Sequence, residues 1–186
     1  MSDLQDVAAV DRRSFLQSAI LLVGGSLVAV PADAIAQALT AAPSFFTAPQ
    51  FALLDEICAI IIPKTSTPGA REAGVPGFID ALMKNWAAES TGEDFRAVLQ
   101  KIDDQAKAQF GGGLLALPPA RRIEAMRAID AAEMRNNRSY RRLKDLVLLT
   151  YYSSEAGATQ ELRYELVPGS WNGSVPLKPG QPAWAA

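Results

Sequence analysis

The chain has 186 residues, of which 49% are apolar and 20% are charged, and its formal net charge is −2. This composition is typical of a globular protein and excludes a disordered chain. The sequence has no histidine and one cysteine, which excludes Ser–His and Cys–His catalytic pairs, histidine-ligated zinc, a C-x-x-C-H haem attachment and an internal disulfide.

The segment 11–37 reads DRRSFLQSAILLVGGSLVAVPADAIAQ, and three interpretations compete for it. A transmembrane span needs about 20 apolar residues, but the run from Ser14 to Val30 is shorter and is interrupted by polar residues and glycine. The Gly24-Gly25 pair disfavours a core helix. A signal peptide accounts for the charged start, the apolar middle, Pro31 and the small residues after it.

The start of this segment resembles a twin-arginine export signal, in which two arginines and a variable residue are followed by Phe-Leu. Arg12, Arg13, Phe15 and Leu16 fit that pattern, and Gln17 stands where lysine is frequent. The resemblance implies export of a protein that has already folded in the cytoplasm. An uncleaved membrane anchor is the competing interpretation.

Cleavage is predicted after Ala36, because Ala34-Ile35-Ala36 has the A-x-A form, and Ala32-Asp33-Ala34 is a second choice. We therefore expect a leader over residues 1–36 and a single domain over residues 37–186. Without the leader the chain keeps 18 − 2 = 16 basic and 20 − 4 = 16 acidic residues. A net charge of zero does not indicate nucleic acid or anionic lipid as a partner.

The rest of the chain shows helical periodicity, and no segment alternates as a sheet would require. Thr47 and Pro49 predict the start of a helix that Pro63 ends. The Gly- and Pro-rich segment 64–77 is expected to be a loop, with a second helix after it.

Three more helices are expected further along. One spans residues 93–110, and another spans 118–136. The last is capped by Ser139, and its apolar positions, Leu149 among them, are expected to be buried. From Gly157 the chain is expected to be extended. The fold class is therefore mainly α, an irregular bundle of about five helices with a loop-rich C-terminal segment.

Few residues in the body indicate catalysis. Tyr151 and Glu155 are four apart and share a helix face, so an acid–base couple is one interpretation and a structural hydrogen bond is the other. Asp103-Asp104 point about 100° apart on a helix, which predicts a solvated face instead of a carboxylate pair. Cys58 lies in the apolar run LLDEICAIII and is expected to be a buried, inert thiol.

Two further features have two interpretations each. The densest basic stretch is either a solvated helix surface or a docking patch for an acidic protein surface. Trp171 and Trp184 lie in non-helical segments, where they either pack on the bundle or anchor an interface. The basic stretch consists of Arg135, Arg138, Arg141, Arg142 and Lys144.

Four motifs occur in order along the chain. They are the twin-arginine leader; FxxLDxIxxxIIP at 51–63 with TPGA, AGV and FID after it; TYYSSEAGA at 150–158; and LxYxxVPGxWxG at 162–173. Together they resemble the gluconate 2-dehydrogenase subunit 3 family, the small (gamma) subunit of membrane-bound sugar and gluconate dehydrogenases.

The resemblance implies a non-catalytic subunit paired with a large FAD-dependent oxidoreductase of the glucose–methanol–choline type, often with a multihaem cytochrome c. It implies that the small subunit carries the large one through the twin-arginine translocase, aids its maturation, and stays in the periplasm at the inner membrane. FAD, and haem c or an iron–sulfur cluster, would be held by the partner subunits. No catalytic, cofactor-binding or metal-binding residue of this chain is implied.

The irregular backbone around the TPGA loop and from Tyr151 to Trp171 has no obvious reason in a bundle core. We therefore expect the partner to dock there. Two other functions remain open: a stand-alone periplasmic enzyme that uses Tyr151 and Glu155, and a solute-binding module. The docking candidates are Thr67, Pro68, Gly69, Ala70, Tyr151, Tyr152, Glu155 and Trp171.

Overall fold

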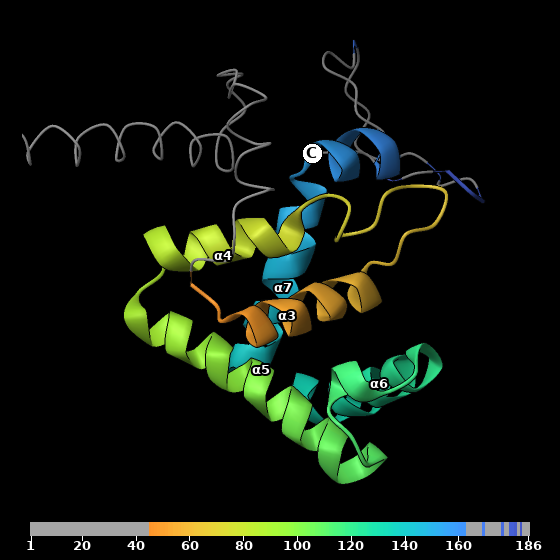
Figure 1. Cartoon of the computed structure of the whole chain (residues 1–186). Helices are drawn as coiled ribbons and strands as arrows, with labels where there is room; N and C mark the ends of the chain where they lie inside the picture. The colour runs from red at the N-terminus through yellow and green to blue at the C-terminus, as the bar shows by residue number, and fades with distance from the viewer. Residues whose placement is uncertain (1–44, 163–168, 170–175, 177–178, 182, 184–186) are drawn as a thin grey trace, which may run out of the picture. The chain divides into compact units, whose positions relative to one another are not determined.

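The computed structural model describes residues 45–162 and, beyond them, residues 169, 176, 179–181 and 183. The predicted leader, Trp171 and Trp184 lie outside the described residues. In the described part there are five α-helices, α3 to α7, with one 3₁₀ turn (η1), one π-helical turn (η2) and no strand (Figure 1). The predicted mainly α bundle is confirmed. No helix of the described residues has the length and apolar content that a membrane span requires.

The first two helices flank the loop that carries the TPGA motif. Helix α3 spans Ala48–Ile61, and the Thr47 N–H donates to Gln50 Oε1 (3.0 Å) at its start, as expected for a cap. Helix α4 spans Val75–Asn85 and so begins inside the predicted loop 64–77, whose predicted end is wrong. The left-handed Gly74 (φ 74°) turns the chain into α4, whose first turn accepts proline because the missing N–H would be unpaired there.

Helix α5 spans Glu89–Phe110 and begins before the predicted residue 93. Gly92 lies in its first turn without breaking it. A β-carbon at Gly92 would lie 2.5 Å from Cζ of Phe45, so a larger residue there would displace the Phe45 ring. Gly111 (φ 80°) ends the helix, as predicted.

Asp103 is not only on a solvated face, because it holds the turn that follows α5. Its Oδ1 accepts from the Leu114 N–H (2.9 Å) at the start of η1, which spans Leu114–Ala116. Its neighbour Asp104 is exposed, as expected. Helix α6 then spans Pro119–Asn136, in agreement with the prediction.

Helix α7 spans Arg138–Tyr152, and its cap is Asn137, not the predicted Ser139. The Asn137 side chain accepts from the Tyr140 N–H (3.0 Å), whereas the Ser139 hydroxyl donates to Asp94 (3.2 Å). After α7 the structure has the π-helical turn η2, Gly157–Glu161, where extended chain was predicted.

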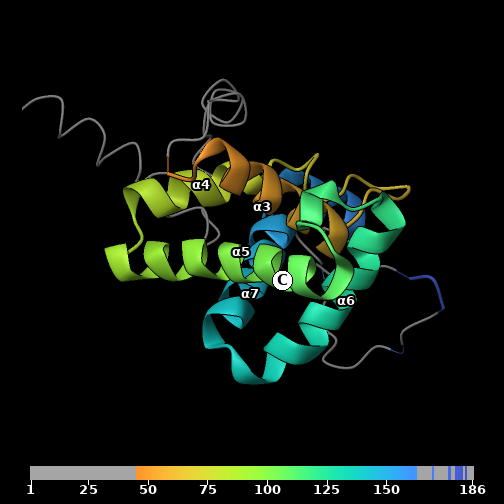
Figure 2. The same ribbon diagram turned by 60° about the horizontal axis from the view of Figure 1, so that its bottom comes forward.

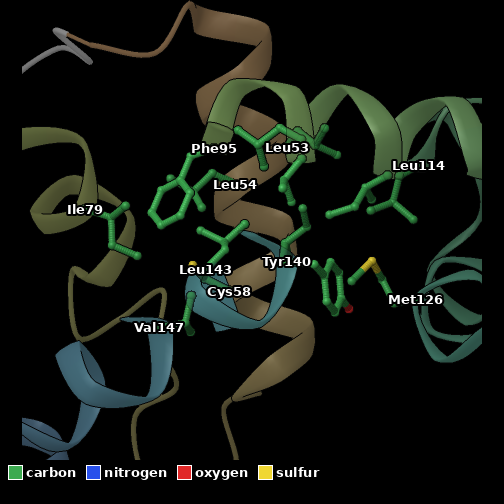
Figure 3. Packing of buried hydrophobic residues seen from close by; sticks show 14 of the residues in the cluster. Leu53, Leu54, Cys58, Ile79, Phe95, Leu114, Met126, Tyr140, Leu143 and Val147 are labelled. Atoms are coloured by element: carbon green, nitrogen blue, oxygen red, sulfur yellow. The ribbon is translucent and has the colours of Figure 1, made fainter. Parts of the chain in front are cut away.

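The core is built around α7, which contacts α3, α4, α5, α6 and η2. This helix passes behind α3 and α5 in Figure 1 and lies next to α5 in Figure 2. Figure 3 shows Leu54 of α3, Phe95 of α5 and Leu143 of α7 in one layer. Cys58 lies in the same cluster with 0% exposure, and burial raises the pKa of its thiol to about 12, which suits the predicted inert role.

The expectation that Leu149 is buried is wrong, since 60% of this residue is exposed. Leu143, Val147 and Tyr151 occupy the buried side of α7. Leu149 lies two residues after Val147 and therefore on a different side of the helix. The largely apolar sequence of this segment concealed that α7 has one exposed side.

A buried carboxylate joins three helices at the other end of α7. Glu133 of α6 is 6% exposed and accepts from Lys101 (2.7 Å) and Gln105 (2.8 Å) of α5 and from the Asn137 side chain (2.7 Å). The hydrogen bond from Lys101 is the main cause that lowers the pKa of Glu133 below its ordinary value of 4.5, although burial opposes it.

We expect Glu133→Gln to flatten the acid dependence of stability. The lowered pKa means that the unfolded chain binds the proton first, so this stabilisation is complete above pH 4.5 and is lost as the pH falls through the folded-state pKa. Urea unfolding at several pH values should show the variant less stable at pH 7 and the difference shrinking in acid. Glu124→Gln, in an exposed 3.6 Å pair with Arg121, is the control for loss of a charge, and identical profiles for wild type and Glu133→Gln would contradict the prediction.

Candidate functional site

The TPGA loop between α3 and α4 is folded against the end of α3. The Ala70 N–H donates to the Ile62 carbonyl (3.0 Å), and the Val75 N–H donates to the Ala70 carbonyl (3.0 Å). A β-carbon at Gly69 would lie 2.6 Å from the Ile62 oxygen, so only glycine allows this close return of the backbone. The motif thus fixes the path of the loop.

Helix α7 holds this loop from the other side. The Tyr151 hydroxyl donates to the Pro68 carbonyl (2.7 Å), across 83 residues of sequence. The Thr67 hydroxyl donates to the Glu161 carboxylate (2.5 Å) in η2. Two hydrogen bonds therefore tie one loop to the end of α7 and to the turn after it. We call this arrangement the clamp; it consists of Thr67–Ala70, Tyr151, Ser154, Gly157 and Glu161.

The chain leaves α7 through a tight turn that the YYSSEAGA motif builds. The Ser154 hydroxyl donates to the Tyr151 carbonyl (2.6 Å) and accepts from the Gly157 N–H (3.1 Å). A β-carbon at Gly157 would overlap the Tyr151 carbonyl oxygen, so this position requires glycine. The π-helical turn η2 starts at this glycine. Such turns are rare in proteins, and those that occur are often found at functional sites.

The structure brings the described docking candidates together at one end of the bundle, but they differ in exposure. Gly69, Ala70 and Tyr151 are buried, and Thr67 and Pro68 are half-buried. Tyr152 and Glu155 are exposed, and Trp171 lies outside the described residues. Of the described candidates, Tyr152 and Glu155 are thus the most accessible to a partner, whereas Tyr151 fixes the loop beside them.

The clamp uses its reactive groups on internal contacts. The Tyr151 hydroxyl donates to the Pro68 carbonyl, and Glu155 is exposed. Of the two interpretations of Tyr151, the geometry therefore favours a structural hydrogen bond over an acid–base couple with Glu155. Burial is the main cause that raises the pKa of Tyr151, which keeps the hydroxyl protonated and donating. Among the described residues, no group of three or more acidic or cysteine side chains is arranged to hold a metal ion.

A polar cluster that sequence reasoning missed connects Arg71, which directly follows the TPGA motif, to α3 and α6. Arg71 pairs with Asp55 (2.7 Å) and Glu56 (2.9 Å) of α3, and Arg122 of α6 pairs with Glu56 (3.0 Å). Burial would raise the pKa of Glu56, but the hydrogen bonds from Arg122 and Arg71 lower it below its ordinary value. The signal that could have found this cluster was the Asp55-Glu56 pair in an otherwise apolar helix.

A comparison with family models finds a match that covers most of the described residues. The model for gluconate 2-dehydrogenase subunit 3 matches residues 48–169, which include both halves of the clamp. No curated protein and no solved structure matches the chain.

Tyr151→Phe is expected to lower the free energy of unfolding by about 1–2 kcal/mol, because the Pro68 carbonyl loses its donor inside the protein. Tyr152→Phe, which removes the same hydroxyl from the exposed neighbour, should change it by less than about 0.5 kcal/mol. Urea unfolding of both variants measures the difference. Equal effects would show that the Tyr151 hydroxyl does not hold the loop.

Gly157→Ala should destabilise the protein by about 1–3 kcal/mol, because the new methyl group has no space beside the Tyr151 carbonyl. Gly112→Ala is the matched control, since a β-carbon there would lie 3.7 Å from Leu117 Cδ2 in ordinary contact. Thermal unfolding compares the two, and a Gly157→Ala protein as stable as the Gly112→Ala protein would refute the proposed packing.

Proposed function

This chain belongs to the gluconate 2-dehydrogenase subunit 3 family, and we propose from this that it is the non-catalytic small subunit of a periplasmic FAD-dependent dehydrogenase acting on sugars or other alcohols. In this role it assists the maturation of the large catalytic subunit and carries it through the twin-arginine translocase. FAD, and haem c or an iron–sulfur cluster, belong to the partner subunits, and a multihaem cytochrome c is a further partner.

The observation that carries the proposal is the use of the family's motif residues in the clamp. Tyr151, Thr67 and Ser154 have reactive hydroxyl groups, and each donates to an acceptor within the chain. The Tyr151 and Ser154 hydroxyl groups hold backbone carbonyls, and the Thr67 hydroxyl holds the Glu161 carboxylate, so all three have structural roles in the clamp. This geometry supports a subunit that presents a fixed surface to a partner.

The export part of the proposal rests on the leader pattern. Arg12, Arg13, Phe15 and Leu16 fit a twin-arginine signal, and Ala34 and Ala36 fit a cleavage site. That route transports folded protein, so a subunit that binds a folded flavoprotein could bring it along without a second leader. The leader then serves both chains.

Replacement of Arg12 and Arg13 by lysine is expected to leave this chain and the flavoprotein partner in the cytoplasm. Fractionation of cells that express the tagged chain, with immunoblots and dehydrogenase assays of both fractions, measures this. Arg121→Lys/Arg127→Lys, which makes the same chemical change at exposed positions of α6, should export normally. A partner that reaches the periplasm in active form in cells lacking this chain would sink the proposal.

A further inference from the structure

A groove of about 550 Å³ lies between α4, α5 and α7. It is largely apolar, and two of its large side chains, Trp86 (47%) and Leu149 (60%), are well exposed. Two charged side chains of α7, those of Arg142 and Asp145, also line the groove. Exposed tryptophan and leucine beside a hollow are typical of an interaction site, because a partner can desolvate them.

The outer side of α7 continues this groove in both directions. Five of its exposed residues follow one another at intervals of four, three, four and three, which places these five on one helix face. The face is basic at the start of α7 and apolar at its end, where Tyr152 lies next to Tyr151 of the clamp. We call it the α7 stripe; it consists of Arg138, Arg142, Asp145, Leu149 and Tyr152.

The basic end of the stripe belongs to a cluster of exposed arginines, Arg135, Arg138, Arg141 and Arg142. Within the described residues none of the four forms an ion pair, whereas Lys144 nearby pairs with Asp130 at 2.6 Å. Three of them lie in the first turns of α7, where the helix dipole disfavours positive charge. The Arg142 guanidinium donates to the Thr91 hydroxyl (3.4 Å), but in the described part of the chain no carboxylate neutralises any of the four arginines. Ion pairing within this part of the fold therefore does not explain their concentration.

We infer that the groove and the α7 stripe together bind an acidic segment of the large catalytic subunit, which inserts an apolar side chain between Trp86 and Leu149. The inference rests on the proposed function and names the surface that this function uses. Arginine pairs with carboxylates through two parallel hydrogen bonds, and tryptophan, tyrosine and arginine are the residues that most often dominate binding energy.

Other occupants suit the surface less well. The segment 163–186 of this chain has one acidic residue, Glu165, against Arg163 and Lys178, so it cannot neutralise four arginines. A second copy docked through the same face would bring arginine against arginine. The leader is acidic, but in the proposed function it is cut away. An acidic partner protein satisfies both the charge and the apolar groove.

Photo-crosslinking locates the occupant. A Leu149→Cys chain is labelled with a benzophenone maleimide and assembled with the purified flavin-containing subunit from the native complex. Because the only native cysteine, Cys58, is fully buried, the label goes to residue 149 alone. A crosslink to the flavin-containing subunit is expected. Crosslinks to residues 163–186 of the same chain or to a second copy, in place of that product, would overturn the inference. Ile123→Cys, at a 45% exposed position of α6, is the control and should not crosslink.

Charge reversal tests the arginines. Arg138→Glu/Arg142→Glu is expected to raise the Kd for the flavin-containing subunit at least about tenfold and to weaken the salt dependence of binding. Arg121→Glu/Arg127→Glu makes the same change in net charge on α6 and should stay within about twofold of wild type. Circular dichroism confirms that each variant is folded.

The outcomes separate this inference from the proposed function. If the wild-type chain does not bind a flavin-containing dehydrogenase subunit, the proposed function fails and the inference fails with it. If the wild-type chain binds and the Arg138→Glu/Arg142→Glu chain binds equally well, the inference alone is wrong and the docking surface lies elsewhere.

Discussion

The hydrogen bond from the Tyr151 hydroxyl to the Pro68 carbonyl is the interaction on which the candidate site depends. It joins the last turn of α7 to a loop that has no regular secondary structure of its own, across 83 residues of sequence. A carbonyl turned toward the protein interior needs a donor, and Tyr151, with 1% exposure, supplies it from within the core. Gly69 allows the loop to return to the end of α3, and Gly157 allows the turn after α7, because a side chain at either position would meet backbone atoms.

Helix α7 has two distinct roles on its two sides. The buried side carries Leu143, Val147 and Tyr151, which pack against α3, α4 and α5 and end in the clamp. The exposed side carries the α7 stripe, from Arg138 to Tyr152. Since both sides belong to one rigid helix, the interactions that fix the core also fix the direction of the stripe. A surface of this kind is preorganised, which reduces the entropy that binding costs.

Sequence periodicity predicted the helices well, because their apolar spacing is local information. It failed where a distant contact decided the outcome. Gly92 resembles a helix breaker, yet it lies inside α5, where the Phe45 ring packs against it. Asn137 displaced Ser139 as the cap, since the Ser139 hydroxyl bonds Asp94 of α5. The turn η2 begins at Gly157, where any β-carbon would overlap the Tyr151 carbonyl oxygen, and helix or strand propensity does not express this requirement.

The candidate site was predictable only in part, for a physical reason. The TPGA loop and the segment that begins at Tyr151 were grouped because their irregular backbone has no obvious reason in a bundle core, and the structure places Tyr151 in contact with the loop. The exposure of Leu149 was missed because the run DLVLLTYY is largely apolar, although Leu149 follows Arg142 by seven residues and Asp145 by four and so shares their exposed helix face. In the proposed complex the buried motif residues would act on partner binding through folding, whereas the residues of the stripe would contact the partner directly. The strongest sequence signal and the most accessible surface thus lie on opposite sides of one helix, and the first holds the second in place.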